Sequence, residues 1–287
     1  MKNVLRTLVF NEQVSLTVAD TTAIVQEGIR LHGLSPASAC VFGKALSVMT
    51  FMSACLKEET GEISLSVKGA GEGGEIAVSG NRKLFIRGYI ENVALEGEVG
   101  VPTESAYLKN AALTIIRDDG YSRPFVGACA VPNGAGIDEA FEEYFRISEQ
   151  LPTRIESTVL LDEEGNCLFA GAAVLQPLPF ADKTTLDKVA ALDLTELLTE
   201  LQKKGVSACV RERFSDGFSV WEEREASYRC NCSREYLTRV LVSLGKEQML
   251  QIIREDGGVH IHCHYCNTDY KFTEEDAERI FPVSSKH

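Results

Sequence analysis

Strand and helix periods alternate along the first 180 residues of the chain. Apolar and polar side chains alternate over residues 14–18, which is typical of a half-buried strand, and a helix capped by Asp20 is expected to follow and to end at Gly33. Alternating or apolar runs between Gly-rich turns predict four more strands, at residues 63–67, 75–78, 84–89 and 112–116. We therefore expect an α+β protein whose N-terminal core mixes helices and β-sheets.

The most apolar stretch, residues 36–57, is expected to be a central buried helix. Ser35-Pro36 is a start signal, because proline in the first helical turn has no N–H to lose. Small side chains occupy most sides of this helix, so we expect it to pack closely against other elements. Lys44 interrupts the run, which falls short of a membrane span.

The core domain is expected to span residues 1–179. One more helix and two strands are predicted before its end, at residues 137–150, 158–161 and 168–174. Pro177 and Pro179 then interrupt both helix and strand patterns, so we place the boundary there.

Residues 180–229 are expected to form a metastable helical linker. Leucine and valine recur on one helix face from Leu186 to about Leu201, a strand-like run follows at residues 206–210, and Asp216-Gly217 suits a turn. The segment has too few apolar positions to build a core of its own, so its helix should persist only when it docks on neighbouring elements. An ordinary interdomain helix is the simpler interpretation of the composition alone.

A glycine-rich stretch at residues 69–74 satisfies a GxGxxG pattern but does not predict a nucleotide site. The dinucleotide motif needs a helix to begin at the glycines, because the helix N-terminus meets the pyrophosphate. Here strand patterns continue on both sides, and Glu72 and Glu75 would repel phosphate. We interpret the stretch as a hairpin turn.

Four of the nine cysteines lie in two close pairs, Cys230 with Cys232 and Cys263 with Cys266. Two short helices are expected between the pairs, the first capped by Ser233, and the second pair is expected in a hairpin. A capping-box pattern over residues 273–276 predicts a last helix. Residues 230–287 are therefore predicted to form a small C-terminal domain.

Four thiolates in two such pairs can form a tetrahedral shell for zinc, with Zn–S distances of about 2.3 Å. We therefore expect one Zn²⁺ per chain. Because the domain has a thin core, the metal should supply much of its folding free energy. His260, His262 and His264 are rival ligands, and a shell of three cysteines and one histidine remains open. Strand alternation places all three imidazoles opposite Cys263, so we favour the four-cysteine shell.

Composition and charge narrow the class of protein. Of the 287 residues, 44% are hydrophobic and 25% charged, and the formal net charge is −13. These values suit a soluble globular protein and do not suit a nucleic-acid-binding one, which needs clustered cations. The start of the chain lacks the apolar core of a signal peptide, and nine cysteines in such a chain favour the reducing cytoplasm. No Ser-His-Asp or paired-carboxylate constellation can be nominated, so we do not expect an enzyme.

Zinc-bound thiolates are also the form of cysteine that oxidants attack. A sulfenic acid on one sulfur has the other cysteine of its pair within reach, because Cα separations of about 4.4–6.8 Å permit a disulfide. Oxidation of both pairs would eject the metal and unfold the domain. The chemistry permits such a switch but does not prove one.

The spacing of the cysteines and several core segments resemble the redox-regulated 33-kDa heat-shock chaperonin family. The cysteine motif is Cys230-Asn231-Cys232-Ser233-Arg234-Glu235 with Cys263-His264-Tyr265-Cys266-Asn267-Thr268. The core segments are Val18-Ala19-Asp20-Thr21-Thr22, His32-Gly33-Leu34-Ser35-Pro36, Arg87-Gly88-Tyr89, Ile116-Arg117-Asp118, Ser148-Glu149-Gln150 and Gln176-Pro177-Leu178-Pro179. The resemblance covers nearly the whole chain and departs from the family at residues 69–83 and 110–112.

The resemblance implies a cytoplasmic, ATP-independent holdase that is inactive while reduced and zinc-bound. It implies that oxidation forms the redox-active disulfides Cys230–Cys232 and Cys263–Cys266 and releases zinc. The linker then unfolds, a homodimer forms, and unfolded or aggregation-prone client proteins bind. Neither nucleic acid nor a membrane is an expected partner. The remaining cysteines are interpreted as core thiols: Cys40, Cys55, Cys129, Cys167 and Cys209.

Two other classes of protein remain as alternatives. A protein or nucleic-acid binding protein with a static zinc ribbon would be inert to oxidants, and the acidic charge weighs against nucleic acid. A thiol oxidoreductase would place CxxC at the start of a helix, whereas here the pair lies in a predicted hairpin.

Overall fold

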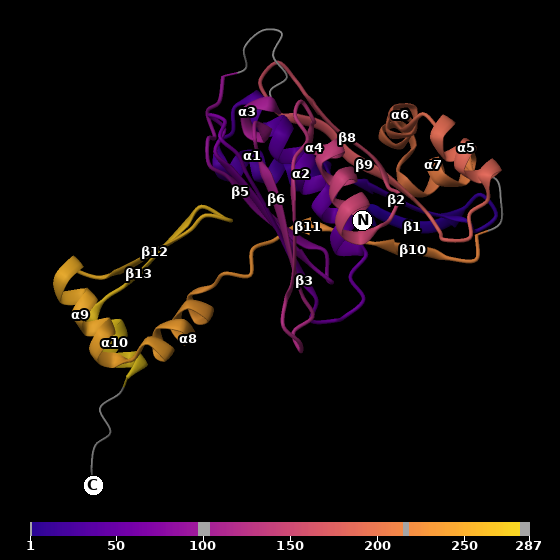
Figure 1. The fold of residues 1–287 in the computed structure, drawn as a ribbon. Coiled ribbons are helices and arrows are strands. Elements are labelled where there is room, and N and C mark those ends of the chain that lie inside the picture. Colours follow the sequence, from indigo (N-terminus) through magenta and orange to yellow (C-terminus); the bar gives the residue numbers. More distant parts are fainter. Residues whose placement is uncertain (1, 97–103, 215–217, 282–287) are drawn as a thin grey trace. The chain divides into compact units, whose positions relative to one another are not determined.

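The computed structural model describes residues 2–96, 104–214 and 218–281 and divides into two compact units, Met1–Arg229 and Cys230–His287 (Figure 1). The larger unit contains two β-sheets and a central helix, and the smaller one contains a hairpin, short helices and the four paired cysteines. The predicted α+β class is confirmed.

The first sheet has five antiparallel strands in the order β10-β1-β2-β9-β8. Its strands are β1 (Val4–Val9), β2 (Val14–Asp20), β8 (Arg154–Leu161), β9 (Cys167–Pro177) and β10 (Trp221–Arg224). Strand β9 includes Pro177, so the first of the two prolines closes a strand rather than following it. Pro177 faces Val14 at the end of the β2 ladder, where the loss of a donor is tolerated.

The second sheet has six strands in the order β11-β5-β4-β3-β6-β7. Its strands are β3 (Glu62–Lys68), β4 (Glu75–Asn81), β5 (Phe85–Ile90), β6 (Ala112–Asp118), β7 (Phe125–Ala130) and β11 (Ser227–Tyr228). All neighbours are antiparallel except β11, which runs parallel to β5. The GxGxxG stretch is the β3–β4 hairpin turn, as predicted, and the carbonyl of Ala106 and the ring of Tyr107 leave no room for a Cβ at Gly71 and Gly73.

Helix α2 (Pro36–Ala54) is the predicted central helix and packs against strands of both sheets. Ser35 caps it by accepting a hydrogen bond from the backbone N–H of Ser38. The helix is long and apolar enough to pass as a membrane span by composition, but 83% of that window is buried inside the fold. It is therefore the core helix that the sequence predicted.

The other helices of the core are α1 (Thr22–His32), α3 (Ser105–Leu108) and α4 (Ile137–Tyr144), which continues as a π-helical turn over Phe145–Glu149. Gly33 ends α1 in the left-handed conformation, as predicted. The capping position of α1 is Thr21 rather than Asp20. The Asp20 carboxylate nevertheless accepts hydrogen bonds from the backbone N–H and the hydroxyl of Thr22.

The linker contains three helices, α5 (Lys183–Ala191), α6 (Leu194–Lys204) and α7 (Val206–Arg213), followed by β10 and β11. The single helix expected through Leu201 is therefore two helices, because Asp193 starts a new one by accepting from the N–H of Glu196. The strand expected at 206–210 is wrong, since these residues form α7. The turn expected at Asp216-Gly217 lies outside the described residues.

These three helices cover one face of the first sheet. Leu197, Leu201, Val210 and other apolar residues of the linker join a buried cluster with Leu5 and Leu16 of the sheet. The opposite face of the same sheet packs toward α2 in a second, larger cluster. Side chains of β2 alternate between the two covered faces of the sheet: Val14, Leu16 and Val18 join the cluster under the linker, and Ala19 joins the one around α2. Because both faces are covered, six of the seven residues of β2 are buried. The linker therefore has more apolar surface to dock than its composition suggested.

The smaller unit contains α8 (Arg234–Leu244), α9 (Lys246–Asp256), the antiparallel hairpin β12 (Val259–Cys263) and β13 (Thr268–Phe272), and α10 (Glu274–Ile280). Ser233 caps α8, and a capping box between Thr273 and Asp276 opens α10, as predicted. The described core of this unit has six buried apolar residues: Leu241, Met249, Ile253, Val259, Phe272 and Ala277. It is as thin as the sequence indicated.

Candidate metal centre

The four paired cysteines occupy two irregular segments of the smaller unit. Cys230 and Cys232 lie in the extended segment before α8, and the cap at Ser233 fixes where that segment gives way to the helix. Cys263 ends β12, and Cys266 lies in the turn before β13. The backbone N–H of Cys266 donates to the carbonyl of Cys263, and Asn267 takes a left-handed conformation that redirects the chain into β13.

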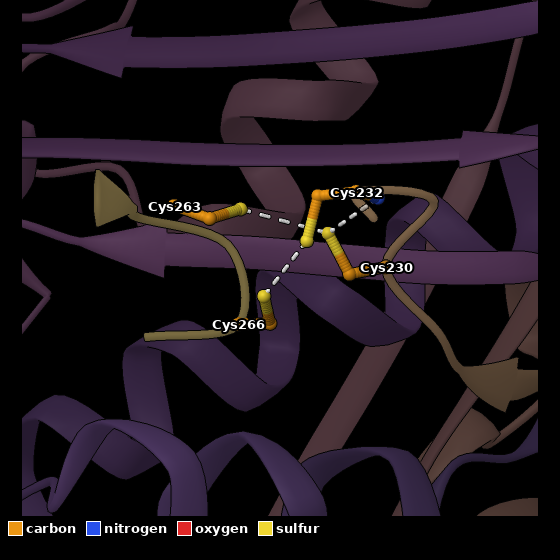
Figure 2. A group of neighbouring side chains, drawn as sticks. All are labelled: Cys230, Cys232, Cys263 and Cys266. Atoms are coloured by element: carbon orange, nitrogen blue, oxygen red, sulfur yellow. Dashed lines mark hydrogen bonds between the residues drawn. The ribbon is translucent and has the colours of Figure 1, made fainter. Parts of the chain in front are cut away.

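This arrangement turns all four sulfur atoms toward one another (Figure 2). The Sγ atoms of Cys230 and Cys263 are 3.7 Å apart, and those of Cys232 and Cys266 are 3.1 Å apart. All four sulfurs lie within 4.8 Å of one another. These distances exceed a disulfide bond of about 2.05 Å, and all four cysteines are free thiols in the structure.

The donor set fits a soft tetrahedral ion. With Zn–S distances of about 2.3 Å, tetrahedral geometry places neighbouring sulfurs about 3.8 Å apart, close to the 3.7 Å between Cys230 and Cys263. The 3.1 Å separation of Cys232 and Cys266 would need to open slightly. The four cysteines can therefore hold a metal ion, and thiolate ligands suit zinc.

The group of candidate metal ligands consists of the four cysteines and includes none of the three histidines near the second pair. His262 instead contacts the Asp269 carboxylate through Nδ1 at 2.8 Å, and its ring lies 5.0 Å from that of His264 in an edge-to-face arrangement. Strand β12 sends His260 and His262 away from Cys263, because successive side chains of a strand point to opposite faces.

The surroundings of the sulfurs affect their proton affinity. Burial raises the pKa of the Cys230 thiol, and the nearby Cys263 acts in the same direction, although the N–H of Cys232 donates to the Cys230 sulfur and opposes the shift. A metal cation would reverse this balance, since a coordinating thiol loses its proton. Without a metal, the four sulfurs lie too close together to be deprotonated easily, because neighbouring thiolates would repel one another.

Tyr270 of β13 contacts the site from outside the cysteine set. Its hydroxyl oxygen lies 3.3 Å from the Cys232 sulfur, and this contact, followed by burial, raises the pKa of Tyr270. Sequence reasoning missed this residue. The available signal was its strand position, four residues after Cys266 and on the same strand face as the buried Phe272.

Arg234 connects the first cysteine segment to the second half of the unit. Its guanidinium lies 4.3 Å from the centre of the Phe272 ring, donates to the Lys271 carbonyl and pairs with the Asp276 carboxylate at 2.7 Å. Asp276 also accepts from the backbone N–H of Thr273 at the start of α10. Arg234 therefore ties the beginning of α8 to β13 and α10.

The other five cysteines, Cys40, Cys55, Cys129, Cys167 and Cys209, belong to the larger unit. Burial raises the pKa of each of these thiols, to about 11 for Cys167 and Cys209. Such thiols stay protonated near neutral pH and react slowly with oxidants.

Comparison with known proteins identifies the family. The family model described as Hsp33 protein matches residues 2–273. The 33 kDa chaperonin of Clostridium novyi is 32% identical over 273 residues and covers 92% of each chain, and that of Thermoanaerobacter pseudethanolicus is 29% identical over 99% of each chain. The crystal structure of the 33 kDa chaperonin from Thermotoga maritima superposes with a TM-score of 0.81 over 97% of each chain at 24% identity, which supports the same fold. The chain therefore belongs to the Hsp33 family, whose named relatives are chaperonins.

Proposed function

We propose that this protein is a redox-controlled, ATP-independent holdase of the cytoplasm, without enzymatic activity of its own. In the reduced state, Cys230, Cys232, Cys263 and Cys266 hold one zinc ion and the linker stays docked. Oxidation disconnects the four sulfurs and frees an apolar surface that binds unfolded proteins. The proposal divides the chain into a core (1–179), a linker (180–229) and a zinc-binding switch domain (230–287).

The observation that carries the proposal is the position of the sulfur cluster in the chain. Cys230 follows directly on the linker, whose helices cover an apolar sheet face. Release of the linker would expose two complementary surfaces, its own and that of the sheet. The linker contributes Leu194, Leu197, Leu198, Leu201, Val206 and Val210, and the sheet contributes Leu5, Val14, Leu16, Val18, Phe169 and Leu175. Contiguous exposed apolar patches are typical of protein-binding sites.

Zinc, when bound, would keep the four sulfurs as thiolates and link the two cysteine segments. A thiolate that attacks hydrogen peroxide breaks the O–O bond, becomes a sulfenic acid and releases hydroxide. The second thiolate of the pair then attacks the oxidised sulfur and expels another hydroxide, so that each disulfide consumes one peroxide. Disulfides cannot serve as thiolate ligands, and the thin core around Phe272 would then lack its main support.

The proposed disulfides join Cys230 to Cys232 and Cys263 to Cys266. In the reduced structure two sulfur contacts run across the pairs, at 3.1 and 3.7 Å. Pairing within each segment leaves the two segments unconnected, whereas pairing across them would preserve the link that zinc provides. The switch therefore requires the pairing within segments, and peptide mapping of the oxidised protein under non-reducing conditions checks it.

The decisive experiment measures aggregation of a chemically unfolded client protein with the reduced, zinc-loaded protein and after peroxide treatment, together with released zinc. Suppression of aggregation only after oxidation, without ATP and with one zinc released per chain, supports the proposal. Size-exclusion chromatography of the same samples tests for the proposed oxidised homodimer. Equal activity in both states would favour a binding protein with a static zinc ribbon instead.

A further inference from the structure

The structure assigns a regulatory role to Tyr270: we propose that its hydroxyl donates a hydrogen bond to the Cys232 thiolate and slows oxidation and zinc release at that sulfur. This inference deepens the proposed function and rests on its metal site. The hydroxyl oxygen is 3.3 Å from the Cys232 sulfur. The other hydrogen bonds described for the four sulfurs join two cysteines or come from a backbone N–H, whereas this one comes from the side chain of Tyr270.

The direction of this hydrogen bond follows from the chemistry of a metal-bound cysteine. A sulfur bound to zinc carries no proton, so it can only accept. The phenol O–H of Tyr270 must therefore be the donor. A hydrogen bond to an ionised acceptor is stronger than one between neutral groups, so this contact stabilises the thiolate in its unreacted state.

The fold holds the hydroxyl at this place. Tyr270 pairs with Ile261 across the β12–β13 hairpin, and its ring packs against the small core that contains Phe272. The hydroxyl approaches Cys232, which belongs to the other cysteine segment. Tyr270 therefore joins the hairpin to the segment that precedes α8 independently of the metal.

The hydrogen bond acts on the first oxidation step. Attack on peroxide uses a sulfur lone pair of Cys232 to form the S–O bond, while the O–O bond breaks and hydroxide leaves. Because Cys232 loses negative charge in this step, the hydrogen bond weakens as the transition state forms. Tyr270 thus raises the barrier for Cys232 and leaves that of Cys263 unchanged. If about half of a charged hydrogen bond is lost at the transition state, its removal accelerates the attack roughly three- to tenfold.

The variant Tyr270→Phe removes the hydroxyl and keeps the ring. We expect zinc release from the full-length, zinc-loaded protein under limiting peroxide to accelerate about three- to tenfold. Mass spectrometry after brief alkylation of the zinc-loaded protein should show a matching increase of label on Cys232 relative to Cys263. The control is Tyr236→Phe, which removes an exposed hydroxyl on α8 of the same unit and should change neither quantity.

Cobalt substitution separates an electronic role from a structural one. Both proteins should bind one equivalent of Co²⁺ with the absorption of a tetrahedral thiolate site, and the sulfur-to-cobalt charge-transfer band should move to lower energy in Tyr270→Phe. This shift is expected because a thiolate without its hydrogen bond is a better electron donor. An unchanged band with unchanged Cys232 alkylation would overturn the proposal, and so would loss of stoichiometric cobalt binding, which would make Tyr270 a structural residue.

These readouts also distinguish the inference from the function on which it rests. If the wild type keeps its zinc under peroxide, the redox switch fails, while the cobalt spectrum and the alkylation pattern still decide the role of Tyr270. If the wild type releases zinc at the same rate as Tyr270→Phe, the switch stands and the inference fails.

Discussion

The carboxylate of Asp138 is buried between helix α4 and strand β8. Ser157 donates both its backbone N–H, at 2.9 Å, and its hydroxyl, at 2.5 Å, to this carboxylate. Lys44 is 3.9 Å away, and its ammonium group is closer to Glu104, at 2.7 Å. Burial outweighs these favourable contacts and raises the pKa of Asp138 from 3.8 to about 6. Between about pH 4 and 6, the folded protein therefore retains a proton on Asp138 that the unfolded chain would release.

This residue should make the protein less stable as the pH rises from 4 to 7. The folded pKa lies above the unfolded value, so the stabilising contribution is complete below pH 4 and is lost as pH rises through 6. We expect it to amount to roughly 2–3 kcal/mol. In Asp138→Asn this component of the pH dependence should disappear, as measured by urea unfolding followed by circular dichroism between pH 4 and 7. Parallel pH profiles for the two proteins would show that Asp138 stays ionised in the fold.

At this scale the sequence predicts local interactions well. Ser35, Ser233 and the Thr273–Asp276 pair were identified as helix caps because a cap bonds to backbone two or three residues away. The contact of Tyr270 with Cys232 was not predicted, since 38 residues separate the two and only the folded hairpin brings them together.

At the scale of elements, the C-terminal end of helix α5 is bound by one side chain of β8. The Arg154 guanidinium donates to the carbonyls of Val189, Ala190 and Leu192 at the end of α5. The last carbonyls of a helix have no partners within it, and a cation there also interacts favourably with the helix dipole. Arg154 therefore supplies the C-terminal cap that the sequence of α5 lacks.

Replacing Arg154 by alanine should loosen α5 selectively. We expect amide exchange across residues 183–192 to accelerate roughly 5- to 30-fold, which corresponds to about 1–2 kcal/mol, while exchange in α6 and α7 changes little. The exchange rate in Arg154→Lys should lie between those of the wild type and Arg154→Ala, because an ammonium group lacks the planar fork of arginine. Arg30→Ala, which removes an exposed ion pair on α1, is the control. Uniform acceleration across all three linker helices would contradict a local cap.

Helices α8 and α9 were predicted because their apolar residues recur at helical spacing, and α2 was predicted because a long apolar run follows the start signal at Ser35-Pro36. The sequence failed for α7, because residues 206–210 contain Val206, Cys209 and Val210 in a spacing too short to distinguish strand from helix. Its buried side follows from packing on β1 and β2, which local propensity does not contain. The short strands β10 and β11 were missed for the same reason, since both depend on partners far away in the sequence.

At the scale of the whole molecule, the end of the linker runs from one sheet to the other. Strand β10 forms an edge of the first sheet, β11 forms an edge of the second, and Cys230 follows after Arg229. The two strands have only four and two residues, and all six are half-buried. Helices α5–α7 are better anchored, because Leu194, Leu197 and Leu201 are almost fully buried. Stability therefore differs along the linker.

The side chain of Arg224 weakens the attachment of β10 further. Its guanidinium donates to the Arg82 carbonyl, but among the described residues its Nη1 atom is buried without a hydrogen-bond partner. Burial, together with the nearby Arg82 cation, lowers the pKa of Arg224. A buried cationic group with an unsatisfied donor costs free energy, so β10 gains less from docking than its backbone pairing with β1 suggests.

We therefore expect the linker to come apart from its C-terminal end when zinc is lost. Trp221, the only tryptophan in the sequence, reports on this step because its ring packs on Phe218 at 4.8 Å and under Arg211 at 4.7 Å. Its emission should shift to longer wavelength as zinc is released by peroxide. Exchange and proteolysis should then appear at residues 218–229 before residues 183–213. Restoring thiol and zinc should reverse the shift, which serves as the control.

Two outcomes would contradict this order of events. Unchanged Trp221 emission after complete zinc release would show that the metal site and β10 are independent. Simultaneous loss of protection in β10 and in α5–α7 would show one cooperative unit, in which the buried leucines of the linker helices give no extra stability.

A staged release has a consequence for the holdase. Partial oxidation would expose the edges of β1 and β5, while the apolar face under α6 and α7 would open only after the remaining linker undocks. Client capacity should then lag behind zinc release in time, a delay that parallel zinc and aggregation measurements can resolve.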